Sequence, residues 1–240
     1  MVEDILEFFD EFSKNYENEI FNKSLGTKYL SDVEVRFVLN YCPVKKGDKI
    51  LDIGIGTGRF AKLLADKGAI VEGVDVSQGM MKEAKKKMEM MQVNFEVADV
   101  GKKVPYPDNT FDYVICIRVL KYISTWKKTI SEISRVLKKD GVFILTIPNK
   151  LSVARFGLKG TKYFLFEPKI VKEFLGKNKL ELIEVVATSR IPFPVWQKVS
   201  NKSVLYILKG LERLMLIILP STFLSRSLLI VSKKRLEDEV

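Results

Sequence analysis

The sequence predicts an α/β fold in which a doubly wound sheet of seven strands carries helices on both faces. From Lys49 onward, short runs rich in β-branched residues alternate with charged segments whose apolar residues recur at helical spacing. The segments between the first strands are long enough for the crossover helices that parallel strands require. A chain of 240 residues that is 47% hydrophobic can bury its own core, so we expect one domain, residues 1–240.

Each apolar run is assigned to one strand of the sheet. The predicted strands are Lys49–Ile53, Ile70–Asp75, Asn94–Val97, Phe111–Ile117, Gly141–Ile147, Leu180–Thr188 and Ser227–Ser232. Helices with an apolar face are predicted between them, at Arg59–Lys67, Gly79–Met91, Ser124–Lys138 and Pro168–Gly176.

Two segments depart from this alternation. Residues 3–40 precede the sheet and read as two helices, with Phe8, Phe9 and Phe12 on one face of the first. Residues 190–225 separate the last two strands and contain a predicted helix from Ser203 to Leu219, closed by Pro220. A connection this long and this apolar is expected to have a role of its own.

The composition excludes several kinds of site. The chain has no histidine, so neither a metal site built on imidazole nor a histidine-based triad or general base can form. Two cysteines are too few for a disulfide scaffold. We therefore expect no metal centre.

Charge and hydropathy indicate where the chain acts. The acidic N-terminal sequence lacks the basic flank and apolar run of a secretory signal, so we expect a cytoplasmic protein. The longest apolar segment is interrupted by Lys209, Glu212 and Arg213 and is not expected to span a membrane. A net charge of +10 would suit nucleic acid or a membrane surface, but lysines dispersed over solvated helix faces explain it at least as well.

The most informative stretch is a glycine loop after the first predicted strand. The strand runs into Gly54, Gly56 and Gly58 and then into a helix, so the backbone can turn tightly and approach a ligand. A dinucleotide fingerprint would need its third glycine at position 59, which is Arg59. Asp52 precedes the loop, and its carboxylate disfavours a pyrophosphate and favours a ligand with an ammonium group.

Acidic residues also end the next two predicted strands. Asp75 can accept both hydroxyls of a ribose, and Asp99 is placed to receive an adenine amino group. Taken singly, each could equally be a helix cap or a surface charge. Together with Asp52 they converge on one edge of a parallel sheet, which favours a nucleoside site.

At these residues the sequence resembles the class I S-adenosylmethionine-dependent methyltransferases, within them the small-molecule group that includes the ubiquinone/menaquinone type. The matching segments, in the family's order, are residues 51–58, 73–80, 98–99, 104–115 and 132–143. The resemblance is dense over residues 48–148 and weak elsewhere. It implies a Rossmann-like sheet in the order 3-2-1-4-5-7-6 with the last strand antiparallel.

The resemblance implies a role for the glycine loop and its neighbours at the methionine end of S-adenosylmethionine. Asp52 would orient the loop or the ammonium group, and Arg118 lies where the family makes backbone contacts to the methionine part. The loop would contact the same part through Gly54, Ile55, Gly56 and Gly58.

At the nucleoside end, the resemblance implies that Asp75 holds the ribose. Val76 and Met80 would flank the adenine, Asp99 would bind its amino group and Val100 would add a backbone N–H group.

A histidine base is missing where relatives frequently carry one, at the positions of Lys121 and Tyr122. The remaining candidates for a base are Tyr16, Tyr106, Tyr122 or a carboxylate, unless the acceptor needs little help with its proton. Tyr16 also matches an N-terminal signature in which an aromatic residue folds over the cofactor, although simple packing of its helix on the sheet explains it as well.

The apolar insertion is expected to select the acceptor. In a helix over 203–219 one stripe would face the cavity and form an apolar roof, made of Val204, Leu208, Leu211, Met215 and Ile218. Ordinary burial against the sheet edge, a dimer face and peripheral contact with a membrane surface are the alternatives.

The sequence thus predicts a methyltransferase that uses S-adenosyl-L-methionine and acts on a small or lipid-like acceptor, as a monomer or homodimer. An RNA or protein methyltransferase and a non-catalytic cofactor-binding module remain alternatives; nucleic acid is disfavoured because no Asn-Pro-Pro-Tyr or Asp-Pro-Pro-Tyr motif is present. The domain would comprise a helical lid (1–47), a cofactor-binding core (48–189), a helical cap (190–225) and the last strand with its tail (226–240).

Overall fold

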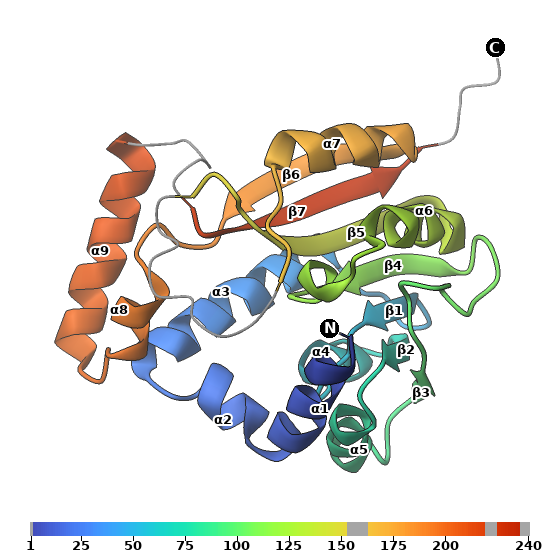
Figure 1. The fold of residues 1–240 in the computed structure, drawn as a ribbon, viewed down its shortest axis with the longest axis horizontal. Helices are drawn as coiled ribbons and strands as arrows, with labels where there is room; N and C mark the ends of the chain where they lie inside the picture. The colour runs from blue at the N-terminus through green and yellow to red at the C-terminus, as the bar shows by residue number, and fades with distance from the viewer. Residues whose placement is uncertain (1, 153–162, 219–224, 236–240) are drawn as a thin grey trace.

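A computed structural model describes residues 2–152, 163–218 and 225–235 (Figure 1). Seven strands form one sheet in the order β3-β2-β1-β4-β5-β7-β6. Neighbouring strands from β3 to β5 are parallel, whereas β7 runs antiparallel to both β5 and β6. The predicted strand order and the antiparallel last strand are therefore confirmed.

The strands lie close to their predicted positions. They are β1 (Lys49–Ile53), β2 (Ile70–Asp75), β3 (Val93–Val97), β4 (Phe111–Cys116), β5 (Leu137–Pro148), β6 (Leu180–Ala187) and β7 (Ser227–Lys234). Strand β5 begins before the predicted Gly141, because Leu137 already pairs with Phe111 of β4. The register shifts after that pair, and Asp140 takes a positive φ of 61° in the irregular stretch.

Helices cover both faces of the sheet, as Figure 1 shows. They are α3 (Leu25–Tyr41), α4 (Arg59–Ala65) and α5 (Gln78–Lys87) on one face, and α6 (Trp126–Val136) and α7 (Pro168–Lys177) on the other. Phe37, Leu64 and Met81 belong to the core under the first face, and Ile130 and Val171 to the core under the second. This doubly wound arrangement leaves the carboxyl ends of the parallel strands free to build a site.

The N-terminal segment forms three helices, so the prediction of two is wrong. Helix α1 (Val2–Phe12) is followed by a 3-10 turn (Ser13–Asn15), the short helix α2 (Tyr16–Ile20) and then α3. Ser24 starts α3 with a capping box, in which its hydroxyl accepts the N–H group of Thr27 at 3.1 Å and the Thr27 hydroxyl accepts the N–H group of Ser24 at 2.9 Å.

The insertion before β7 packs on α3. It contains α8 (Phe193–Gln197), which the sequence did not predict, and α9 (Lys202–Ile218), which stands at one end of the molecule in Figure 1. Fully buried Trp196 anchors this small separate core, with its ring centroid 5.2 Å from that of Tyr29 on α3. The predicted helix end at Leu219 and Pro220 lies outside the described residues.

The face of α9 that is buried differs from the predicted stripe. Leu205, Leu208 and Met215 pack against the Trp196 core. Val204 and Leu211, by contrast, are 45% and 46% exposed. No described residue of α9 borders the large cavity described below, so the prediction that this stripe roofs the cavity is wrong.

Glu212 explains how the helix is rotated about its axis. Its carboxylate is buried and accepts the N–H groups of Arg190 and Ile191 at 2.9 and 2.8 Å, together with the hydroxyl of Ser189. A buried carboxylate with three donors is held strongly, so it turns Glu212 inward and Leu211 outward.

Among the helices described, none is long and apolar enough to cross a membrane.

Candidate active site

A cavity of about 780 Å³ opens at the carboxyl ends of the parallel strands. Its wall comes from α1 and α2, from the loops after β1, β2, β3 and β4, and from the end of β5 and the start of β7. Most of the residues that the sequence assigns to the cofactor meet there: Gly54, Gly56, Asp75, Val76, Met80, Asp99, Val100 and Arg118.

The glycine loop has the backbone that only glycine adopts easily. Gly54 and Gly56 have φ values of +68° and +56° and line the cavity. A Cβ atom at Gly54 would lie 2.1 Å from a methyl carbon of Val119. Gly58, at φ +81°, begins α4 outside the cavity wall, and the Ile55 side chain is buried in the core. These last two residues can therefore serve the site only by shaping the loop.

Asp75 stands at the end of β2 with its carboxylate on the cavity wall. One oxygen accepts the N–H group of Gly56 at 2.9 Å and the other that of Ser77 at 3.0 Å. Burial raises the pKa of Asp75 even though these hydrogen bonds oppose the rise. The carboxylate thus fixes the glycine loop and still faces the cavity.

Asp99 has a similar position beyond β3. Its Oδ1 atom accepts the N–H group of Gly101 at 2.9 Å, and Asp99, Val100 and Gly101 all border the cavity. Val76 and Met80 line the wall after β2, so an apolar slot lies between the two acidic residues.

Asp52 lies beneath the glycine loop and not on the cavity wall. It is 3% exposed, and its Oδ2 atom has no hydrogen-bond partner among the described residues. Burial and the nearby charge of Asp75 raise the pKa of Asp52 to about 8. An orphaned carboxylate oxygen under this loop suits a cationic group bound above it.

The N-terminal helices are tied to both cofactor loops. Asp10 of α1 accepts the N–H group of Gly79 at 2.8 Å and the hydroxyl of Ser77 at 2.5 Å. Glu17 of α2 accepts the Thr57 hydroxyl at 2.7 Å and pairs with Lys87. These contacts hold α1 and α2 against the cavity.

Two of the three tyrosine candidates line the cavity. The Phe9 ring lies between Tyr16 and Tyr122, at centroid distances of 6.2 and 5.4 Å. Burial raises the pKa of both phenols, so they stay protonated at neutral pH and can donate hydrogen bonds. Tyr106 packs against Phe111 at 5.1 Å, and the structure does not bring it to the cavity.

The sequence did not reveal an ion cluster on the cavity wall. Glu34 of α3 accepts from Arg118 Nε at 2.8 Å and from Arg59 Nη2 at 2.9 Å. Burial alone would raise the pKa of Glu34, but the guanidinium groups of Arg118 and Arg59 outweigh it and hold the pKa below its usual value. The available signal was the position of Glu34, three and four residues before Phe37 and Val38, on the buried face of an amphipathic helix.

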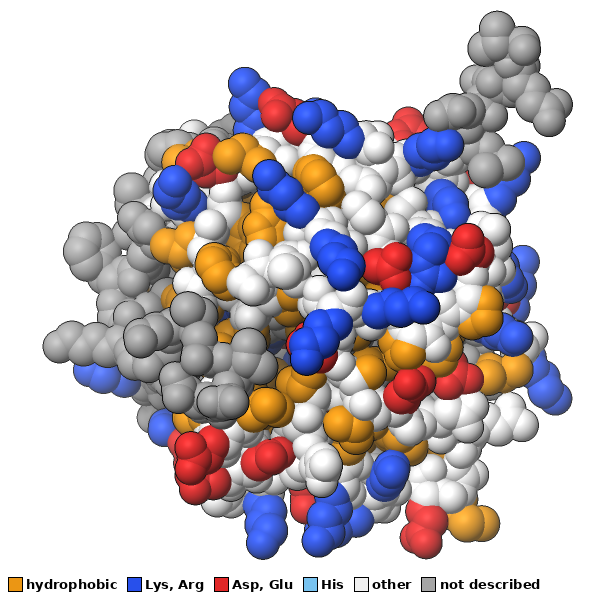
Figure 2. Space-filling view, turned by 45° about the vertical axis from the view of Figure 1, so that its right-hand side comes forward, with side chains coloured by type: hydrophobic (Ala, Val, Ile, Leu, Met, Phe, Trp, Pro, Cys, Tyr) orange, Lys and Arg blue, Asp and Glu red, His pale blue; other side chains and the backbone are white. Residues whose placement is uncertain are grey.

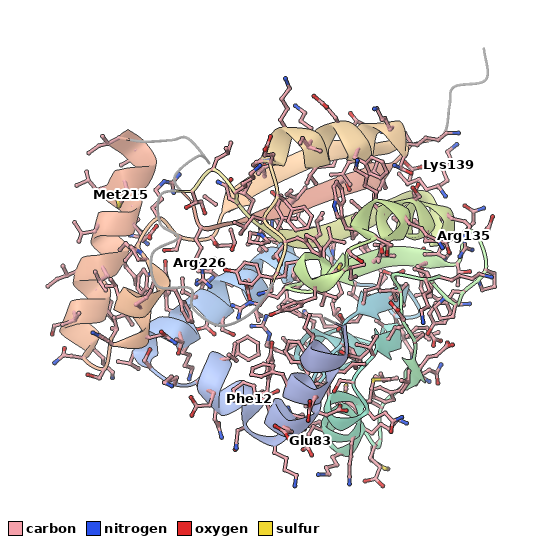
Figure 3. All side chains as sticks on the ribbon, in the orientation of Figure 1. Phe12, Glu83, Arg135, Lys139, Met215 and Arg226 are labelled. Atoms are coloured by element: carbon pink, nitrogen blue, oxygen red, sulfur yellow. The ribbon has the colours of Figure 1, made fainter. Side chains whose placement is uncertain are left out.

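The sequence also did not predict the two cations, Arg226 and Lys121, at the end of the cavity beyond β5. Arg226 precedes β7 and places its guanidinium carbon 4.4 Å from the ring centroid of Phe193 (Figure 3). Lys121 places its Nζ atom 4.8 and 5.0 Å from the ring centroids of Tyr122 and Tyr163. No motif surrounds Arg226 in the sequence, and the pairing of β7 with β5, far away in the chain, helps to bring it to the cavity.

Comparison with known proteins agrees with this geometry. A family model described as a methyltransferase domain matches residues 51–145. The chain is 34% identical to an uncharacterized protein of Methanocaldococcus jannaschii over 187 residues, 78% of this chain and 67% of that protein. It is 25% identical to the demethylmenaquinone methyltransferase of Lysinibacillus sphaericus over 216 residues, 88% of each chain.

A solved structure shares the fold over nearly the whole chain. Magnesium protoporphyrin IX methyltransferase of Synechocystis, determined with bound SAH, superimposes with a TM-score of 0.67 at 18% identity, covering 98% of this chain and 100% of that one. Taken together, the sheet order, the glycine loop with its acidic strand ends and these matches show that the chain belongs to the class I S-adenosylmethionine-dependent methyltransferases.

Proposed function

We propose that this enzyme transfers the methyl group of S-adenosylmethionine to a small, partly apolar molecule. The observation that carries the proposal is the continuity of the cavity, which runs from Asp75 and Asp99 past Tyr122 to Pro148 and Arg226. It has room for the cofactor at one end and for an acceptor at the other.

The carboxylates and apolar side chains at the cofactor end of the cavity suit the parts of S-adenosylmethionine. We assign the ribose to Asp75 and the adenine to the slot formed by Val76, Met80, Asp99 and Val100. The methionine part would lie over Gly54 and Gly56, above the orphaned oxygen of Asp52 and beside Arg118.

When bound, the cofactor supplies a methyl group on a sulfonium, which an acceptor atom attacks in line. The chain's own residues contribute alignment and exclusion of water. Phe9 and Tyr16 close the cavity from the N-terminal side, and Tyr16 and Tyr122 can orient the acceptor by donating hydrogen bonds. These two phenols are the site groups that we retain from the sequence-based candidates.

The acceptor is proposed to be a small molecule with apolar parts, because Ile20, Leu30, Ile147, Pro148 and Phe193 border the same cavity. The relatives named above act on a demethylmenaquinone and on a magnesium porphyrin, according to their names. A nucleic-acid acceptor is not favoured: on the face shown in Figure 2 basic side chains are interleaved with acidic and apolar ones instead of forming one track.

Calorimetry tests the cofactor assignment directly. The purified protein is expected to bind S-adenosylmethionine or S-adenosylhomocysteine and not NAD, because Arg59 stands where a dinucleotide fingerprint needs its third glycine. Binding of NAD without heat from either sulfur ligand would contradict the proposal.

Replacing Asp75 with alanine is expected to weaken binding of S-adenosylhomocysteine by about 1–3 kcal/mol, since hydrogen bonds from two hydroxyls to a carboxylate are lost. Asp66→Ala is the matched control, because Asp66 pairs with Lys62 at the surface, away from the cavity. An unchanged affinity in Asp75→Ala, measured by calorimetry, would place the ribose elsewhere.

A further inference from the structure

The acceptor end of the cavity carries positive charge that is only partly paired with carboxylates in the described part of the chain. Arg118, Lys121 and Arg226 all border the cavity there. Arg118 is paired with Glu34. Among the described residues, Lys121 and Arg226 have no carboxylate partner, and their side chains rest against the aromatic rings of Tyr122, Tyr163 and Phe193.

Within the described residues, the acidic group that acts on these cations is committed to other partners. Glu34 is the acid that acts on both Lys121 and Arg226, and it already pairs with Arg59 and Arg118. Outside the described residues, segments 153–162 and 219–224 contain no Asp or Glu. The acidic residues of 236–240 follow the carboxyl end of β7, whereas Arg226 precedes its amino end. S-adenosylmethionine adds a sulfonium and an ammonium against one carboxylate, so its binding raises the positive charge further.

Burial and mutual repulsion both disfavour the protonated forms of Lys121 and Arg226. Burial, and then the charges of Arg118 and Arg226, lower the pKa of Lys121 to about 7. Burial and Arg118 lower the pKa of Arg226 to about 10. Cations that are partly withdrawn from water and left unpaired cost free energy, and an anionic ligand between them would remove that cost.

The position of these cations points to the acceptor and not to the cofactor. Asp75 and Asp99 follow β2 and β3, whereas Arg226 begins at the amino end of β7, two strands beyond β4 in the opposite direction. Neighbouring strands lie about 5 Å apart, so Arg226 stands about 10 Å along the sheet from the loop after β4. Lys121, in the loop after β4, is close enough for the charge of Arg226 to act on it, so the two long side chains can share one anionic group within this interval.

We propose that the acceptor carries an anionic group, a carboxylate or a phosphate, which Lys121 and Arg226 bind together. This inference rests on the proposed function and narrows its substrate class. Arg226 supplies a charge that persists at any physiological pH, and Lys121 supplies an ammonium whose protonation the bound anion favours. In the complex Lys121 is therefore a cation that positions the acceptor rather than a base.

Three amphiphiles that differ only in their head groups test this inference: octanoate, octyl phosphate and octanol. Their binding to the S-adenosylhomocysteine-saturated protein is measured by calorimetry. At least one anionic probe is expected to bind about tenfold or more tightly than octanol. Which of the two anions binds better identifies a carboxylate or a phosphate acceptor.

The variants Arg226→Gln and Lys121→Gln are each expected to remove most of this difference. Arg213→Gln and Lys202→Gln, which change exposed cations of α9, are the controls and should keep it. Because an unpaired cation is removed, neither cavity variant should have a lower thermal midpoint without ligand. Arg226→Lys, which keeps the charge, should retain part of the preference.

The affinity for octanoate should also fall as the pH rises through about 7, as the Lys121 ammonium loses its proton, and this dependence should vanish in Lys121→Gln. The groups that face Lys121 are Arg118, Arg226, Glu34, Tyr122 and Tyr163. The pKa values of Arg118 and Tyr122 are raised, that of Arg226 is about 10 and that of Glu34 is lowered, so we assign a change near pH 7 to Lys121.

Each other outcome has a definite meaning. Equal binding of anionic and neutral probes, or no binding of any up to about 10 mM, overturns the inference. A tenfold loss of S-adenosylhomocysteine affinity in Arg226→Gln also overturns it, since the anion would then be the cofactor's own carboxylate. Failure of the unaltered protein to bind S-adenosylhomocysteine would instead defeat the proposed function.

Discussion

Replacing Glu34 with glutamine is expected to lower the free energy of unfolding by about 3–5 kcal/mol. The substitution leaves two guanidinium groups, Arg59 and Arg118, partly buried and facing each other without their shared carboxylate. Chemical denaturation followed by circular dichroism measures the loss. Glu19→Gln is the matched control, because Glu19 pairs with Lys23 at the surface, where such pairs contribute less than about 1 kcal/mol.

The effect of Glu34 should depend on pH in one direction. Its pKa is held below the usual value, so its stabilising contribution is present above that value and disappears as the pH falls through the lowered pKa of the folded protein. The two proteins should therefore converge in stability in acid. A constant difference down to low pH, or a loss below about 1 kcal/mol at neutral pH, would contradict the assigned role.

Aspartate substitutions at two positions of α9 that lie four residues apart should differ strongly in their effect on stability. Met215 packs against the Trp196 core beside buried Glu212, so Met215→Asp introduces a second carboxylate into an apolar contact and should cost several kcal/mol. Leu211 is 46% exposed, and Leu211→Asp should change stability by less than about 0.5 kcal/mol.

In a Trp126→Phe background, the fluorescence of Trp196 reports on this part of the fold, while circular dichroism reports on the whole. Cofactor affinity should be unchanged in Leu211→Asp, since no described residue of α9 borders the cavity. A large loss of acceptor turnover in a folded Leu211→Asp protein would restore the roof that the sequence predicted.

The comparison of Leu211 with Gly54 shows which features a sequence can predict. The glycine loop is local: strand, turn and helix start lie within a dozen residues, and positive φ angles at Gly54, Gly56 and Gly58 follow from residue type. The meeting of Asp75 and Asp99 at one edge of the sheet could also be predicted, because parallel strands place their carboxyl ends at the same edge.

Features that depend on contacts between distant segments could not be predicted from the sequence. Glu34 and Arg118 are 84 positions apart, and Asp10 reaches Gly79 across 69. The rotation of α9 was mispredicted because a periodicity of apolar residues cannot anticipate that Glu212 is drawn inward by backbone donors of residues 190 and 191. Arg226 escaped notice for the same reason.

The contacts of Asp10 and Glu17 with the cofactor loops have a kinetic consequence. These carboxylates join the first helices to Gly79 and Thr57, so the wall that α1 and α2 form moves away only when several hydrogen bonds break together. We expect exchange of spent for fresh cofactor on that side to require these hydrogen bonds to break, so that their strength would limit how often the N-terminal helices open the site.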